Sequence, residues 1–222
     1  PALDRLAREG VRFADASTQS PLTGPAHAGI LTGAYPTRYG IRDNASTPIP
    51  PDAVTLAESL KAAGYRTGAF IGAFILDRAY GFDQGFEEFD SRFDHFESGD
   101  KLKVERTADE VVTPALRWLS KLPANEPFFA WVHFYDPHAP YTPPPPYKTR
   151  FLTHPYDGEI AYMDSAVGRL IAKLTEKGAL DRTLIVAIGD HGESLGEHGE
   201  EEHGLFLYDA VLRIPWIMRL PG

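Results

Sequence analysis

A short segment near the C-terminus carries the side chains best suited to metal chemistry. Four possible ligands, Asp190, His191, His198 and His203, fall within fourteen residues, directly after an apolar run at 184–188. An apolar, β-branched run that stops at Gly-Asp-His is typical of a buried parallel strand, and open α/β sheets bind ligands at the carboxyl ends of such strands. Carboxylate oxygen and imidazole nitrogen between small glycines suit a divalent cation. The segment therefore predicts a metal site; a solvated acidic loop is the less favoured alternative.

A second segment, Ser-Pro-Leu-Thr-Gly-Pro-Ala-His at 20–27, leads into a helix expected over 26–32. A hydroxyl at a helix N-terminus lies where backbone N–H groups and the helix dipole stabilise an anion. A metal ion beside Thr23 would lower the pKa of its hydroxyl and create a nucleophile. Threonine is also a common N-cap, so the spacing leaves both roles open.

A third segment, Phe-Tyr-Asp-Pro-His-Ala-Pro-Tyr at 134–141, follows a strand expected over 128–134. Asp136 and His138 would then lie at the same sheet edge as Asp190, which favours a site over a simple aromatic, proline-rich turn. His133 alternates with aromatic residues inside the strand, and we expect it to be a packed or hydrogen-bonded core residue.

Composition limits the class of protein. The 222 residues carry a formal net charge of -9, which argues against a nucleic-acid partner. Hydrophobic and charged contents of 43% and 24% are typical of a globular protein, and the length suits a single domain over 1–222. No apolar run approaches the roughly 18 residues that a membrane span requires. The absence of cysteine excludes disulfides, thiolate ligands and a cysteine nucleophile, and leaves the compartment and the oligomeric state open.

Hydrophobic periodicity predicts helices that alternate with strands. Helices are expected at 1–10, 26–32, 55–63, 108–119 and 159–177, strands at 11–14, 67–71, 128–134, 184–188 and 212–220, and loops at 77–100 and 136–147. This alternation predicts an α/β fold with a mostly parallel central sheet flanked by helices.

Several motifs, in order along the chain, resemble those of the sulfatase family of the alkaline phosphatase superfamily. They are residues 3–13, the stretch Thr-Gly-Pro-Ala-His-Ala-Gly-Ile-Leu-Thr-Gly at 23–33, Gly85-Phe86, 136–141 and 190–199. The resemblance implies a sulfatase-like fold of which this chain is a fragment, lacking a first strand and a C-terminal subdomain. That first strand would bring one or two further Asp ligands to the metal.

The resemblance also implies roles for single residues. Thr23 falls where the family carries its nucleophile, a formylglycine made from Cys or Ser, and Asp190 and His191 fall on metal ligands, with Thr23 beside them. His27 replaces the signature arginine that helps to fix the nucleophile.

The resemblance implies roles for four further positions. His203 falls where many sulfatases carry a lysine that contacts the anionic ester. Asn44 and His138 match positions that contact the transferred group or protonate the leaving oxygen. For His198 we expect a supporting or loop role.

Threonine cannot be oxidised to formylglycine, so Thr23 favours phosphate-type over sulfate esters. The sequence thus predicts a metal-dependent hydrolase of phosphate-type or sulfate esters, using Ca²⁺, Mg²⁺, Mn²⁺ or Zn²⁺. Its substrate would be a small-molecule or glycan- or lipid-linked anionic ester. A phospho-group transferase with the same phospho-threonine intermediate and a non-catalytic binding module with the sulfatase fold are the alternatives.

Overall fold

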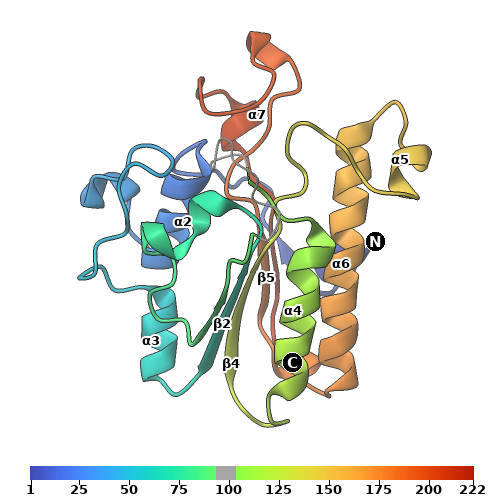
Figure 1. Ribbon diagram of the computed structural model, residues 1–222. Helices are drawn as coiled ribbons and strands as arrows, with labels where there is room; N and C mark the ends of the chain where they lie inside the picture. The colour runs from blue at the N-terminus through green and yellow to red at the C-terminus, as the bar shows by residue number, and fades with distance from the viewer. Residues whose placement is uncertain (94–103) are drawn as a thin grey trace.

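The computed structural model describes residues 1–93 and 104–222, and it is an α/β structure with strands between layers of helices (Figure 1). One three-stranded sheet has the order β3-β2-β4, with β3 at Glu88–Asp90, β2 at Arg66–Ile71 and β4 at Phe128–His133. The other has the order β1-β6-β5, with β1 at Val11–Arg12, β6 at Trp216–Arg219 and β5 at Ile185–Ile188. The first sheet is parallel throughout, whereas both pairings of the second are antiparallel. The expected α/β fold is confirmed, but its parallel character is confined to one sheet.

The helices are α1 (Ala2–Glu9), α2 (Thr23–Thr32), α3 (Leu56–Ala62), α4 (Ala108–Lys121), α5 (Tyr147–Arg150), α6 (Pro155–Glu176) and α7 (Asp209–Leu212). Short 3-10 turns lie at Pro36–Tyr39, Phe74–Leu76, Arg78–Tyr80, Leu180–Arg182 and Glu197–Gly199. Figure 1 shows α2 and α3 on one side of the β2–β4 sheet and α4 and α6 on the other. None of the helices in the described ranges is long and apolar enough to cross a bilayer.

The two sides of β2 explain this layering. Ala69 and Ile71 pack into the cluster that contains Ala28 and Leu31 of α2, whereas Phe70 packs against α4. Successive strand residues face opposite sides of a sheet, so a continuous apolar run buries both faces. A separate cluster joins α1 and α6 to β5 and β6.

Several boundaries differ from the sequence prediction for local physical reasons. α2 begins at Thr23 rather than 26, because Pro25 lies in the first turn, where a helix needs no N–H donor from it. The last strand starts only after Pro215, and the short helix α7 occupies the start of the range expected for it. β3 lies inside the segment expected to be a loop, and the end of that segment, 94–100, lies outside the described residues.

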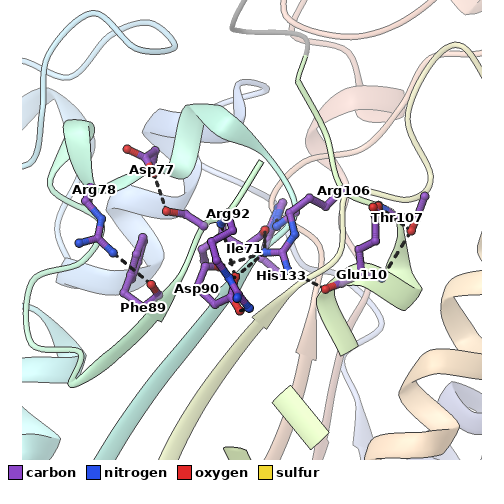
Figure 2. A network of polar contacts seen from close by, with 12 residues as sticks. Ile71, Asp77, Arg78, Phe89, Asp90, Arg92, Arg106, Thr107, Glu110 and His133 are labelled. Carbon is purple, nitrogen blue, oxygen red and sulfur yellow. Dashed lines mark hydrogen bonds and ion pairs between the residues drawn. The ribbon is translucent and has the colours of Figure 1, made fainter. Parts of the chain in front are cut away.

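A buried arginine ties the carboxyl ends of β2 and β3 to the start of α4 (Figure 2). The Arg106 guanidinium lies 3.1 Å from the Asp90 carboxylate and donates to the carbonyl oxygens of Ile71 and Glu110. α4 then begins with a capping box in which Thr107 and Glu110 bond each other's backbone N–H groups. This network fixes the sheet edge beside which β4 ends at His133.

Candidate active site

Thr23 lies in the first turn of α2, with its side chain buried. The N-cap is Leu22, so the alternative role of Thr23 as a capping residue is wrong, and its hydroxyl is free for another partner. That partner is His191, whose Nε2 lies 3.1 Å from Thr23 Oγ1. Two motifs that are 168 residues apart in the sequence therefore meet at the N-terminus of α2.

The direction of this hydrogen bond follows from the other ring nitrogen. His191 Nδ1 lies 2.8 Å from the Gly192 carbonyl oxygen and must donate to it. Nε2 then carries the lone pair of the neutral ring, and the Thr23 hydroxyl donates to it. Asp190 Oδ2 lies 3.4 Å from the same Nε2. A carboxylate, an imidazole and a hydroxyl thus converge on one position, which fits part of the ligand set of a divalent cation.

Asp190 and His191 are the acidic and imidazole side chains that meet at this position beside Thr23. Within 1–93 and 104–222, no group of three His, Cys, Asp or Glu side chains has the geometry of a metal centre. Asp190 and His191 lie in contact with each other, and their role as metal ligands stays a prediction.

His27 is buried beneath Thr23. Its Nδ1 lies 2.8 Å from the Thr23 carbonyl oxygen and 3.4 Å from Asp190 Oδ2. Burial lowers the pKa of His27, and the charge of Asp190 offsets this only in part. A neutral His27 that donates from Nδ1 to the Thr23 carbonyl connects the first turn of α2 to Asp190.

His133 is the site neighbour that the sequence prediction missed. It is buried, as expected for a core residue, but its ring centre lies 4.8 Å from that of His27. Its Nδ1 accepts a hydrogen bond from the Gly72 amide at 3.3 Å, which leaves the proton on Nε2. Burial, reinforced by His27, lowers the pKa of His133 to about 3, so the ring is neutral at ordinary pH. The position of His133 at the end of a strand is the sequence feature that could have indicated that it lies near the site.

The electrostatics favour an ionised Asp190. Burial opposes ionisation, but the imidazoles of His191, His27 and His133 outweigh it and hold the pKa of Asp190 below its usual value. An anionic carboxylate is the form that binds a cation.

A second group of rings lies beside His191. The ring centre of His203 is 4.0 Å from that of His191 and 5.3 Å from that of His138. His203 Nδ1 bonds Glu193 Oε1 at 2.9 Å. Although burial disfavours the imidazolium, Glu193 raises the pKa of His203. Glu193 belongs to the quoted motif, but the sequence alone gave it no role.

Two further contacts hold the ring of His138. Its ring stacks on Tyr135 at a centroid distance of 4.2 Å, and its Nδ1 lies 2.8 Å from the Ala139 carbonyl oxygen. His138 Nε2 therefore carries the lone pair of the neutral ring. Burial lowers the pKa of His138.

Two predicted positions have other surroundings. Asn44 Oδ1 accepts from the Gly24 amide at 2.8 Å, so its side chain holds the first turn of α2. His198 is exposed and stacks on Tyr208 at 3.7 Å, away from the convergence of Thr23 and His191. This matches the loop role expected for His198.

Comparison with known proteins identifies the family. A model of the Sulfatase family matches residues 1–222. The chain belongs to the sulfatase family.

The similarity extends to sequence relatives and to solved structures. The chain is 27% identical to the uncharacterized sulfatase YidJ of Escherichia coli, over 99% of this chain and 57% of that protein. It is 31% identical to an N-acetylglucosamine-6-O-sulfatase of Bacteroides thetaiotaomicron, over 83% of this chain and 34% of that protein. The crystal structure of a phosphonate monoester hydrolase of Agrobacterium radiobacter shares the fold, with a TM-score of 0.80, 21% identity, and coverage of 100% of this chain and 63% of that one. The chain spans about half the length of such curated relatives as YidJ.

Proposed function

We propose that the whole protein hydrolyses phosphate-type or sulfate esters and that Thr23 is its nucleophile. The observation that carries this proposal is the 3.1 Å contact between the buried Thr23 hydroxyl and His191 Nε2 at the N-terminus of α2. Membership of the sulfatase family supports ester hydrolysis as the reaction class.

Asp190, His191 and Thr23 would hold a divalent cation, such as Ca²⁺, Mg²⁺, Mn²⁺ or Zn²⁺. When bound, the cation lowers the pKa of a hydroxyl ligand and neutralises charge that develops on the ester oxygens. The donor set of oxygen and nitrogen ligands fits this role but does not choose among these ions.

The remaining residues supply positioning and proton transfer. Thr23 Oγ1 releases its proton to solvent and forms a bond to phosphorus or sulfur, while the bond to the alcohol oxygen breaks on the opposite side. His203, charged beside Glu193, gives a proton from Nε2 to the departing alcohol oxygen. His138 Nε2 faces the same substrate ester. Water then hydrolyses the ester that has formed on Thr23 and regenerates the Thr23 hydroxyl.

The nucleophile favours phosphorus over sulfur. A phospho-threonine is opened by water at phosphorus. A sulfo-threonine has no hemiacetal hydroxyl and cannot expel its sulfate by that route. We therefore expect turnover of phosphodiesters, phosphomonoesters or phosphonate esters to exceed turnover of sulfate esters.

The experiment compares the whole protein with its Thr23→Ala and Thr32→Ala variants. Both residues are threonines of α2, but the Thr32 hydroxyl bonds local backbone groups, the Ala28 carbonyl and the Ala34 amide, which makes it a matched control. Aryl phosphodiester, phosphomonoester and sulfate substrates are each supplied with the four cations. We expect Thr23→Ala to reduce kcat by about 10³-fold or more, and Thr32→Ala to leave it nearly unchanged.

Mass spectrometry of the acid-quenched reaction provides a second readout. A phosphate adduct on Thr23 during turnover supports the proposal, and an alcohol acceptor that receives the phosphate would identify a transferase. Wild-type turnover in a folded Thr23→Ala variant would refute the nucleophile assignment.

A further inference from the structure

The strongest unexplained feature near the site is a buried carboxylate on α6. Glu159 is 4% exposed, lies in the second turn of α6 and is not among the motif residues. Its Oε2 accepts from the His138 amide at 3.0 Å, and its Oε1 accepts from the Thr142 amide at 2.6 Å. One side chain therefore anchors both ends of the loop that carries His138.

We propose that Glu159 is a positioning residue, whose two amide contacts fix the backbone of 138–142 so that the His138 ring faces the Thr23 site. The proposal rests on the proposed function, since it concerns a residue assigned to ester binding or leaving-group protonation. Glu159 touches no reacting atom and acts through His138.

The loop needs such an anchor because of its composition. Residues 136–147 contain six prolines, which lack an N–H group and cannot form a regular hydrogen-bonded pattern. His138 and Thr142 still have amides to satisfy, and a carboxylate bonds two N–H groups more strongly than a neutral acceptor would. Glu159 thus replaces the missing secondary structure at the point where the site residue lies.

The neighbouring glycine supports the same interpretation. A Cβ atom on Gly158 would come within 2.8 Å of Pro143 Cγ and 3.1 Å of Phe151 Cβ. The absence of a side chain at Gly158 lets the proline-rich loop approach α6 closely. The pair Gly158-Glu159 therefore combines close contact with a bidentate anchor.

Three separate constraints then act on His138. Glu159 fixes its backbone amide, the Ala139 carbonyl fixes the proton on Nδ1, and Tyr135 covers one face of the ring. With these in place the ring lies beside His203. If the contact between Glu159 and the His138 amide is lost, the backbone can move, but the imidazole itself is chemically unchanged.

Two further carboxyl groups in this region, those of Asp136 and Glu105, also have raised pKa values. Burial, followed by the charge of Glu159, raises the pKa of Asp136 to about 7 and that of Glu105 to about 6. Burial also raises the pKa of Glu159, but the amides of His138 and Thr142 oppose this effect. Of these three carboxyl groups, Glu159 is the one that accepts from two backbone amides of the loop.

Asp164 offers a matched control on the same helix. It is 6% exposed and accepts from the amides of Ala2 and Leu3 at 2.9 and 2.7 Å. Glu159→Gln and Asp164→Asn each convert a buried carboxylate with two amide partners into a neutral amide. Only the first change acts on the His138 loop; the second acts on the start of α1.

The test measures kcat and KM of the whole protein and records the amide signals of His138 and Thr142 by ¹⁵N NMR. We expect Glu159→Gln to lower kcat by about 10–100-fold with KM changed less than about threefold. Amide exchange at His138 and Thr142 should accelerate by a similar factor. Glu159→Asp should recover part of both effects, and Asp164→Asn should leave kcat within about threefold.

The NMR measurement separates this proposal from the proposed function. Unchanged amide signals in Glu159→Gln, or an equal loss of kcat in Asp164→Asn, would overturn the positioning role. If Thr23→Ala keeps full turnover, the nucleophile assignment fails, while the amide data still decide whether Glu159 fixes His138.

Discussion

Each imidazole around Thr23 has one ring nitrogen fixed by a neighbouring group. Carbonyl oxygens accept from His27, His138 and His191, the Gly72 amide donates to His133, and Glu193 pairs with His203. His203 makes the shortest of the contacts between these rings and a carboxylate, 2.9 Å to Glu193, and Glu193 raises the pKa of His203, which favours a positive charge next to an anionic ester. Burial lowers the pKa of His27, His133 and His138, which favours the neutral form of these three rings.

Asp136 should make the stability of the fold depend on pH. Burial, followed by the charge of Glu159, raises its pKa from 3.8 to about 7. The folded protein therefore binds this proton more tightly than the unfolded chain, so the stability from Asp136 is complete below about pH 4 and is lost as the pH rises to about 7.

Asp136→Asn should remove this dependence. Between pH 4.5 and 8 the variant should gain about 1–3 kcal/mol in unfolding free energy relative to the wild type, after allowance for solvent screening. Urea unfolding at both pH values measures the change. Parallel pH profiles for the two proteins would contradict the assignment.

The sequence could indicate which residues come together where each belongs to a motif at the end of an element. Thr23, Asp190 and His191 lie in contact, and their catalytic and metal-binding roles stay predictions. The roles of His133 and Glu159 were not visible, since each depends on a contact with a segment far away in the chain. Alternation within β4 marked His133 as buried but did not show that α2 would place His27 beside it.

At the scale of elements, the glycines of the Asp-His-Gly-Glu motif have a packing role. A Cβ atom on Gly192 would lie 2.1 Å from the Ala210 carbonyl oxygen, and one on Gly189 would lie 3.0 Å from Pro215. Gly192 also donates its amide to the Val211 carbonyl at 2.8 Å. The segment after β5 passes so close to α7 and the start of β6 that the motif has room only for glycine at these two positions. The sequence alone did not reveal this reason for the glycines.

Gly192→Ala should consequently destabilise the protein by about 2–3 kcal/mol, because backbone atoms must move to admit the methyl group. Gly168→Ala in α6 is the matched control: its Cβ would meet only Ala2 Cβ at 3.7 Å. That change should be neutral or stabilise by up to about 1 kcal/mol, as alanine does inside a helix. Chemical unfolding of both variants tests the contrast, and equal effects would refute it.

Element boundaries were predictable where capping signals are local. Thr55 with Glu58 and Thr107 with Glu110 form the capping boxes that begin α3 and α4, close to the predicted starts. β3 was missed because its three residues have no periodic signal and gain their hydrogen bonds only beside β2. The antiparallel pairing of β5 with β6 depends on the path of 189–215, which composition does not specify.

At the scale of the whole molecule, the site is assembled from the start of α2 and the segments that follow β4 and β5. Thr23, His138 and Asp190 come from these three places, and their order along the chain was part of the resemblance to the sulfatase family. With a net charge of -9, this chain repels anions, so an anionic ester needs a local source of positive charge. We propose that His203 supplies one and that a divalent cation at Asp190 and His191 supplies the larger one.

Cation binding should therefore be visible as stability of the folded protein. A ligand that binds only the folded state stabilises it by RT ln(1 + [L]/Kd), or about 2.7 kcal/mol at 100 times Kd. We expect chelation to lower the Tm of the whole protein and one of the four cations to restore it. Asp190→Asn should abolish the response, whereas Asp15→Asn, at a side chain 87% exposed, should retain it. Thermal unfolding with and without chelator measures this difference. A response to the cation that persists in Asp190→Asn would place the binding site elsewhere, because the carboxylate beside His191 is the strongest cation ligand that the described part of the site offers.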